Sequence, residues 1–346
     1  MKKFSAFLLL VSALMLAGLN AADAQTIRRV NNTPGITGAN IYTTLQAAHD
    51  AASAGDFIYL EPSSISYGNL TCVRPLTIIG NGYFLTENTG LQLDVRDSET
   101  GTISFAAGSA GSRITGCVIT TLYIGASNVT VERNRITSQL YIGYNPQIGS
   151  VTVSNIIVRQ NYSPGNFYLY PGSSAPVSNV NISNNIIHNG ISTPTAQYAS
   201  MTGILIANNV LGRADGATTG ELQVDNAVIK NNYITRAAAT YTPRNNAATY
   251  NIGAGTQFGT SNGNQQNVLP TSVFVGSTAS TDGEYQLRAG NNPARGTGES
   301  GVDVGAFGGA VPYRLSGIPN VPTIYEYNQS VSGNTLNATI STRSNN

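Results

Sequence analysis

Five short units of similar sequence recur in the middle of the chain, and this repeat constrains the fold more than any other feature. The units are NVTVERNRI from Asn128, NIIVRQNYS from Asn155, NVNISNNII from Asn179, GILIANNVL from Gly203 and NAVIKNNYI from Asn226. Their last asparagines form one column, with steps of 27, 24, 24 and 23 residues: Asn134, Asn161, Asn185, Asn209 and Asn232. Upstream, LTIIGNGYF places Asn81 in this column, and SRITGCVI places Cys117 there. A fixed period of this size is typical of a solenoid.

Each unit alternates apolar and polar residues with period two, which predicts a strand. The positions five and three residues before the column are apolar and should face inward: Val129 and Val131, Ile156 and Val158, Val180 and Ile182, Ile204 and Ile206, Ala227 and Ile229. A further short strand lies between units, as in LYI at Leu122 and at Leu140. We therefore predict an all-β fold, a single-stranded right-handed parallel β-helix over residues 56–300. The column asparagines should tolerate a left-handed backbone at the corner and hydrogen-bond from coil to coil.

The two ends of the repeat region differ from it in composition, as caps of a solenoid do. TTLQAAHDAASAGD from Thr43 predicts a helix inside an N-terminal capping segment, residues 25–55. Residues 301–346 form a C-terminal closing segment. Within it, TIYEY and TLNATIST flank Ser332-Gly333-Asn334 and predict a hairpin.

Residues 1–24 predict a secretory signal peptide, with Lys2 and Lys3 before the apolar stretch Phe7 to Leu19. We expect a secreted, extracellular or cell-surface protein, with the periplasm as an alternative, and no membrane span after the signal is removed. Without these residues, two lysines and one aspartate are lost, leaving 16 basic and 16 acidic residues. A neutral chain has no field to attract nucleic acid, so we expect no nucleic-acid partner. Cys72 and Cys117 have no matching metal ligands. We expect them to be buried thiols rather than a disulfide.

Two stretches of the chain resemble a known group of proteins. AHDAASAGDFIYLEP with LTIIGNGYF resembles the start, and EYQLRAGNNPARGTGESGVDVGAFGG the last coil, of secreted bacterial right-handed parallel β-helix proteins of the pectin-lyase-like superfamily. The resemblance covers about residues 41–327. It implies the architecture and no particular activity, because the superfamily holds polysaccharide lyases, glycoside hydrolases and adhesins.

Catalytic residues of these enzyme types are hard to find. A lyase resembling this superfamily would use calcium held by carboxylates and a basic side chain. The densest carboxylate group is Asp94, Asp97 and Glu99, beside Arg96 in an apparent insertion. A hydrolase would need a pair of carboxylates, and the candidates share one coil: Asp215, Glu221 and Asp225. The only histidines are His49 and His188. We expect no cofactor, with calcium only if the protein is a lyase, and most simply no catalysis.

A group of tyrosines suggests binding instead. Alternation places Leu122, Leu140 and Phe167 inward, so the residues that follow them point outward on successive coils: Tyr123, Tyr141 and Tyr168, with Tyr144 and Tyr170 near by. Exposed rings can stack against sugars. They are also ordinary strand residues. We expect a monomer that presents this face to an extended polymer such as polysaccharide. The alternatives are a polysaccharide lyase or hydrolase and a structural spacer or adhesin. Glu132 and Arg159 share another outward column and should form an ion pair.

Overall fold

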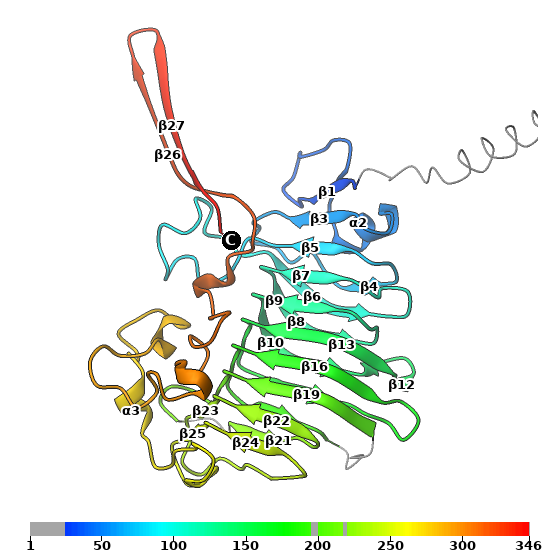
Figure 1. Cartoon of the computed structure of the whole chain (residues 1–346). Coiled ribbons are helices and arrows are strands. Elements are labelled where there is room, and N and C mark those ends of the chain that lie inside the picture. Colours follow the sequence, from blue (N-terminus) through cyan, green and yellow to red (C-terminus); the bar gives the residue numbers. More distant parts are fainter. Residues whose placement is uncertain (1–24, 195–199, 217–219, 346) are drawn as a thin grey trace, which may run out of the picture.

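A computed structural model describes residues 25–194, 200–216 and 220–345 (Figure 1). The predicted signal peptide lies outside the described residues. Two long sheets of parallel strands dominate the molecule, as the sequence predicts for a parallel β-solenoid. The strands stack one coil on the next from β3 to β25, and we call this stack the solenoid.

The first sheet contains eleven strands in the following order. They are β2 (Ile41–Tyr42), β1 (Ile27–Val30), β3 (Phe57–Leu60), β5 (Thr77–Ile79), β7 (Arg113–Thr115), β9 (Thr130–Glu132), β13 (Val153–Arg159), β16 (Val177–Ser183), β19 (Met201–Ala207), β22 (Ala227–Lys230) and β24 (Ala247–Thr249). This sheet holds the strand that precedes the asparagine column in each repeat.

The second sheet contains twelve strands and holds the segments that follow the column. Along its main path lie β21 (Glu221–Gln223), β18 (Gly190–Ser192), β15 (Asn166–Leu169), β10 (Arg135–Ile142), β14 (Tyr162–Ser163), β17 (Ile186–Ile187), β20 (Val210–Leu211), β23 (Tyr233–Ile234) and β25 (Ile252–Gly253). The strands β4 (Leu70–Cys72), β6 (Glu99–Phe105) and β8 (Val118–Ile124) join it through β10. A small separate hairpin, β11 (Tyr144–Asn145) and β12 (Gly149–Ser150), projects from one coil.

The apolar pairs predicted to point inward form the core between the two sheets. Register places Ile156 beside Val180 and Val180 beside Ile204 on successive coils. All ten predicted residues are buried, and so are the inward residues of the later strands, such as Leu122, Leu140 and Phe167. Apolar side chains at equivalent positions stack on one another from coil to coil, so each coil buries its apolar residues only by contact with the neighbouring coils.

The asparagine column forms a continuous hydrogen-bonded ladder at the corner between the sheets. The Asn161 side-chain oxygen accepts from the backbone N–H of Asn134 at 2.9 Å, and Asn185, Asn209 and Asn232 repeat this contact one coil further each time. The ladder continues beyond the predicted column to Asn251 and Asn264. At the other end, the Cys117 backbone N–H donates to Asn134. Asn81 keeps its register position, but its amide donates instead to the carbonyls of Asp94 and Arg96.

The left-handed backbone belongs to a different residue than we predicted from the sequence. It lies one position before each of the five asparagines of the predicted column, at φ between 54° and 57°. These residues are Arg133, Gln160, Asn184, Asn208 and Asn231. The left-handed residue turns the chain, so the ladder asparagine that follows points its side chain into the buried corner.

After β25 the chain turns back along the outside of the solenoid. Figure 1 shows this segment in yellow and orange on one flank. It includes α3 (Pro270–Val273), η2 (Gly283–Tyr285), η3 (Glu299–Gly301) and η4 (Leu315–Gly317). We call residues 268–320 the flank segment. The stacked strands therefore end at Gly253, so residues 270–300, which the sequence analysis included in the β-helix, belong to neither large sheet.

The flank segment is held by a second apolar core and by the left-handed residues. The core joins outward residues of the second sheet, such as Tyr162 and Tyr233, to Phe274 and Tyr285 of the flank segment. The side chains of the residues with left-handed backbone donate hydrogen bonds to the backbone of the flank segment, one coil after another. Asn208 donates to the carbonyl of Asp303, Asn184 to Ala306 and Gly308, Gln160 to Pro312, and Arg133 to Ile318.

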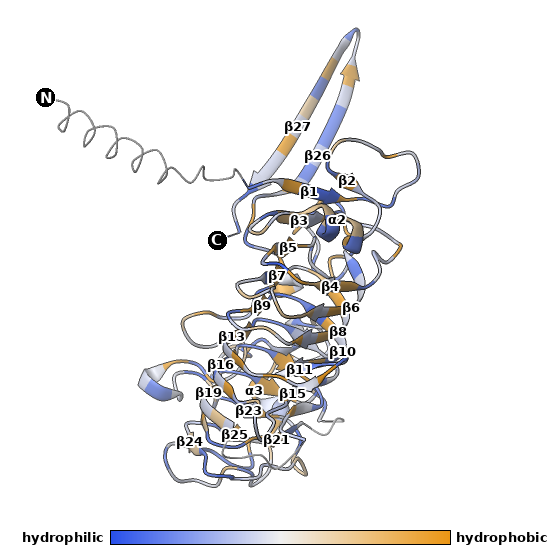
Figure 2. Ribbon diagram, turned by 90° about the vertical axis from the view of Figure 1, so that its right-hand side faces the viewer, coloured by the Kyte–Doolittle hydropathy of each residue, from blue (hydrophilic) through white to orange (hydrophobic). Residues whose placement is uncertain are grey.

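The ends of the chain contain the predicted helix and hairpin. The helix α2 (Leu45–Ala51) begins at Thr44, whose side chain accepts from the Ala47 N–H, and it packs against β1 to β4. At the other end, β26 (Thr323–Ser332) and β27 (Thr335–Arg343) pair in antiparallel fashion around Gly333 and Asn334. This hairpin extends away from the solenoid (Figures 1 and 2).

Candidate functional site

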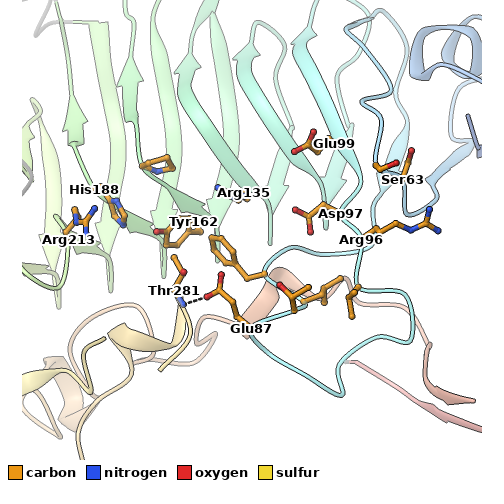
Figure 3. A pocket seen from close by; sticks show the side chains of 16 residues that line it. Ser63, Glu87, Arg96, Asp97, Glu99, Arg135, Tyr162, His188, Arg213 and Thr281 are labelled. Carbon is orange, nitrogen blue, oxygen red and sulfur yellow. Dashed lines mark hydrogen bonds between the residues drawn. The ribbon is translucent and has the colours of Figure 1, made fainter. Parts of the chain in front are cut away.

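A cleft of about 740 Å³ lies where the second sheet faces two long irregular segments (Figure 3). The sheet side carries Asp97, Glu99, Arg135 and Tyr162, with His188 and Arg213 further along the solenoid. The opposite side is formed by residues 84–87 and by Thr281 of the flank segment. Sequence reasoning missed this cleft, although it named Asp97, Glu99 and His188 one by one.

The coil register aligns the side chains on the sheet side of the cleft. Glu99, Val118, Arg135 and Tyr162 pair in sequence on four adjacent coils, so they occupy one outward column. Arg135 and Tyr162 each come directly after a ladder asparagine, which points inward, so alternation turns them outward. Adjacent coils are about 4.8 Å apart, so the column forms a row of about 15 Å along the solenoid axis.

The far wall joins two segments separated by nearly 200 residues of sequence. The Thr281 N–H donates to the Glu87 carboxylate at 2.6 Å, the dashed line in Figure 3. The Asn88 amide donates to Asp282 at 2.9 Å. This pairing fixes the insertion at residues 84–97 against the flank segment and leaves the cleft between them and the sheet.

Phe84 connects this wall to the sheet side. Its backbone lies in the left-handed region at φ 53°, a strained conformation for an aromatic residue. In that conformation its ring lies 4.7 Å from the Arg135 guanidinium and meets Tyr162 edge to face at 5.0 Å. The strain is thus stored where the ring holds a cleft arginine.

Burial shifts the pKa values of three titratable side chains in the cleft. It raises the pKa of Asp97, an effect partly offset by Arg135 and strengthened by Glu99. Burial also raises the pKa of Tyr162 far above its ordinary value. It lowers the pKa of His188 to about 4, with a further contribution from Arg213, so this ring is neutral at pH 7. The His188 Nε2 atom lies 2.8 Å from the Tyr285 hydroxyl.

The Arg135 side chain has unused hydrogen-bonding capacity. Its Nε atom is buried and meets no hydrogen-bond partner among the described residues. A buried donor without a partner costs free energy, about 1–3 kcal/mol. Together with the Asp97 carboxyl group and the Tyr162 phenol, the guanidinium gives the cleft donors, acceptors and aromatic edges suited to a polar ligand.

The other candidate carboxylates are dispersed. Asp94 pairs with Arg96 at 2.6 Å, and Asp215 pairs with Arg213 at 3.1 Å, both near the surface. Asp225 is fully buried with its nearest cation, Arg244, 3.8 Å away. Within the described ranges, no group of three or more histidine, cysteine, aspartate or glutamate side chains is arranged to hold a metal ion. Cys72 and Cys117 are both buried and unpaired, as expected.

The predicted ion pair of Glu132 and Arg159 forms, with a distance of 2.6 Å between the guanidinium and the carboxylate, and a third residue takes part in it. Arg113, on the preceding coil, binds the other oxygen of the same carboxylate. The two arginines cover Glu132, whose side chain is only 2% exposed.

The five tyrosines predicted to bind ligand lie together, three of them on strands of the second sheet and Tyr144 and Tyr170 beside these strands. Tyr123, Tyr141 and Tyr168 pair in register on three adjacent coils. Tyr141 stacks on Tyr123 at a ring distance of 4.9 Å and on Tyr168 at 5.1 Å. Tyr144 and Tyr170 lie tilted beside them, 4.9 Å from each other. Both faces of the Tyr141 ring are therefore covered by other tyrosines, and the group offers mainly ring edges and hydroxyls.

Comparisons of the chain with models of known protein families, with curated proteins and with solved structures found no match in any of the three. None of the helices in the described part of the chain is long and apolar enough to cross a membrane.

Proposed function

We propose that the protein is a secreted or cell-surface right-handed β-helix of the pectin-lyase-like type that binds an extended polysaccharide without cleaving it. The N-terminal segment with α2 caps one end of the solenoid in this proposal. The polymer lies in the cleft and follows the solenoid axis, across the coils that carry Glu99, Arg135 and Tyr162.

The observation that carries the proposal is the row of Glu99, Arg135 and Tyr162, with Val118 between the first two, along one side of the cleft. Coils stacked at a regular spacing present similar positions at regular steps, which suits a ligand that is itself a repeating chain. The cleft contains both arginines and carboxylates, so it offers donors and acceptors to hydroxyl groups. The Arg135 guanidinium supplies a charged donor group within this row, held against the Phe84 ring.

The tyrosine group takes a secondary role in this proposal. Tyr141 and Arg135 lie on the same strand, six residues apart, so about 20 Å separates them along β10. A polymer that runs along the solenoid axis contacts one of these columns and not both. Because the tyrosine rings cover each other, we place the principal contact in the cleft.

A polysaccharide lyase or glycoside hydrolase is the second candidate. The observation that favours it is the presence of Asp97 beside Arg135 in the cleft, with the pKa of Asp97 raised chiefly by burial. A carboxyl group with a raised pKa and a nearby guanidinium are the kinds of groups that act in acid–base chemistry. Such an enzyme would act in the same cleft.

The test is binding to a panel of neutral and anionic polysaccharides, measured by affinity electrophoresis and calorimetry. We expect Arg135→Ala to weaken binding of the preferred polymer about tenfold or more, the effect of losing one charged hydrogen bond. Arg236→Ala is the matched control, since Arg236 lies outside the cleft and its side chain should not contact the polymer. Loss of binding only in Tyr141→Ala would move the site to the tyrosine group.

The same panel separates binding from catalysis. Each polymer is incubated with the protein, with and without calcium, and unsaturated products and new reducing ends are measured. Product release that disappears in Asp97→Asn would replace the binding proposal with the enzyme. No binding and no product with any polymer would contradict both.

A further inference from the structure

The terminal hairpin of β26 and β27 has one side that is mostly apolar, and no described residue covers this side. Pairs along the hairpin alternate between its two sides. Val331 with Leu336, Gln329 with Ala338, and Tyr327 with Ile340 lie on one side. Ser330 with Asn337 and Asn328 with Thr339 lie on the other. Figure 2 shows the two strands extending from the molecule with apolar positions along them.

The exposure of the apolar side is unusual for a folded protein. Val331 is 74% exposed, Leu336 63% and Ile340 58%. An isolated two-stranded hairpin is marginally stable in water. Its strand edges also carry little protection, because no charged residue occurs between Tyr327 and Thr342. These features point to a partner that covers the hairpin.

The base of the hairpin is fixed against the rest of the molecule. The Arg343 guanidinium donates to the carbonyls of Gly90 and Leu91 at 2.8 and 2.7 Å, and the Leu93 N–H donates to the Ile324 carbonyl at 2.9 Å. The hairpin is therefore attached to the insertion that follows Tyr83 and is directed away from the solenoid (Figure 1). Since no described residue of the chain covers the apolar face, we look for its occupant in another molecule.

We propose that this occupant is a second copy of the chain, with two hairpins packed face to face in antiparallel orientation. The apolar strip matches itself under a twofold axis through its centre, near Gln329 and Ala338. The charged residues of the hairpin, Glu326 and Arg343, both lie near its base. In the antiparallel arrangement each base meets the uncharged tip of the other copy, and the two solenoids lie at opposite ends of the paired hairpins.

The overall charge and the size of the strip agree with a weak association. The chain carries a formal net charge of only +1, so copies do not repel each other at long range. A strand of ten residues is about 33 Å long, and two strands give a face of roughly 300 Å². Two such faces bury roughly 600 Å², below the ~1,200 Å² of stable complexes. The dimer should therefore form only at high protein concentration, in contrast to the monomer that we expect from the sequence.

Sedimentation velocity over about 1 µM to 1 mM, the range of weak complexes, tests the proposal. The wild-type weight-average mass should rise toward that of a dimer. The double variant Leu336→Ser with Ile340→Ser should stay monomeric, while Asn337→Ser with Thr339→Ser, on the polar side of the same strand, should behave as wild type. A wild type that stays monomeric throughout, or equal association of all three proteins, would overturn the proposal. The melting temperature of each variant should match the wild type, because the substituted side chains lie outside both cores.

Oxidative cross-linking tests the orientation. Ala338→Cys lies beside the proposed axis and should give a disulfide-linked dimer, whereas Asn337→Cys on the polar side should not. Cys72 and Cys117 are buried and do not interfere. A dimer that forms by sedimentation without a cross-link through Ala338→Cys would overturn the antiparallel face-to-face arrangement. Neither experiment depends on a polysaccharide, so its outcome is independent of the proposed function of the cleft.

Discussion

At the corner between the two sheets, two neighbouring residues have separate tasks in every repeat. The first adopts the left-handed backbone and points outward, and the second points inward and joins the ladder. In three repeats both residues are asparagine, which is why the sequence motif NN recurs there: Asn184 and Asn185, Asn208 and Asn209, Asn231 and Asn232. Asparagine suits the first position because it tolerates positive φ, and the second because its amide both donates and accepts.

The ladder position should therefore be far more sensitive to substitution than an exposed asparagine. The Asn209 oxygen accepts from the Asn185 backbone N–H, and its amide donates to the Ile182 carbonyl at 2.9 Å, all of them buried. We expect Asn209→Ala to lower the free energy of unfolding by about 1–3 kcal/mol, the cost of buried groups left unpaired.

The control for this substitution is Asn155→Gly. Asn155 also bonds an asparagine of the neighbouring coil, but at an exposed position with φ 58°, which glycine adopts readily. Its loss should change the stability by less than about 0.5 kcal/mol. Denaturant unfolding of both variants is the measurement, and equal effects would mean that the buried ladder does not stabilise the corner.

The tyrosine group should contribute stability through its mutual stacking. Tyr141 contacts a ring on each face, whereas Tyr123 stacks on Tyr141 alone among the column. A stacked aromatic pair contributes about 0.5–1.5 kcal/mol beyond area burial. We expect Tyr141→Ala to destabilise the protein by about 1–3 kcal/mol and Tyr123→Ala by roughly half as much. Equal melting temperatures for the two variants and the wild type would show that the rings do not stack in solution.

Among the elements, the flank segment is attached to the solenoid in a manner that depends on a buried carboxyl group. Asp282 accepts hydrogen bonds from the Ser316 N–H at 2.6 Å and the Tyr313 hydroxyl at 3.2 Å, and from Asn88 of the cleft wall. It is fully buried, and this burial raises its pKa despite the hydrogen bonds. One side chain thus joins the flank segment, the insertion and, through Tyr313, the buried hydroxyl of Tyr83.

The raised pKa fixes the sign of a pH effect. Because Asp282 binds its proton more tightly in the folded state than in the unfolded state, where its pKa is near 3.8, ionisation of this group opposes folding. As pH falls from 7 through the folded pKa, the wild type should gain stability relative to Asp282→Asn, which has no such titration. Thermal melts of both proteins at several pH values give the difference directly.

Glu132 provides an internal contrast with the opposite sign. Its burial would raise the pKa, but Arg113 and Arg159 together hold it below the usual value. The stability that Glu132 contributes is therefore present above its unfolded pKa and lost as pH falls through the folded one. Relative to Glu132→Gln, the wild type should lose stability on acidification. The same direction of change for Asp282 and Glu132 would contradict the assigned environments.

At the scale of the whole molecule, the solenoid was predictable and the cleft was not. The repeats between residues 128 and 235 carry their own period, so Val131 and Ile182 could be assigned to the core from the sequence. The ladder beyond Asn232 was missed because its steps shorten to 19 and 13 residues. The cleft requires Glu87 to meet Thr281, and contacts over such a sequence separation leave no local signal. The stacking of the tyrosines could not be predicted from the sequence either. The apolar–polar alternation of a strand tells on which face of the sheet a side chain lies, but not how its ring is oriented.

The division of the chain into solenoid, flank segment and hairpin predicts different results for two truncations. Removing residues 321–346 deletes the hairpin, in which Thr323 is the one buried residue among the described strand positions. This protein should fold with nearly the wild-type melting temperature and remain monomeric at high concentration.

Removing residues 268–346 also uncovers the second core, including Tyr162, Val210 and Tyr233. It leaves the side chains at the left-handed positions without their backbone partners in the flank segment. Exposed apolar surface of that extent promotes aggregation. We expect this shorter protein to aggregate or to melt at a much lower temperature, as measured by calorimetry and light scattering. A stable, monomeric product would mean that the solenoid is complete without the flank segment, and that the flank segment serves only to build the cleft.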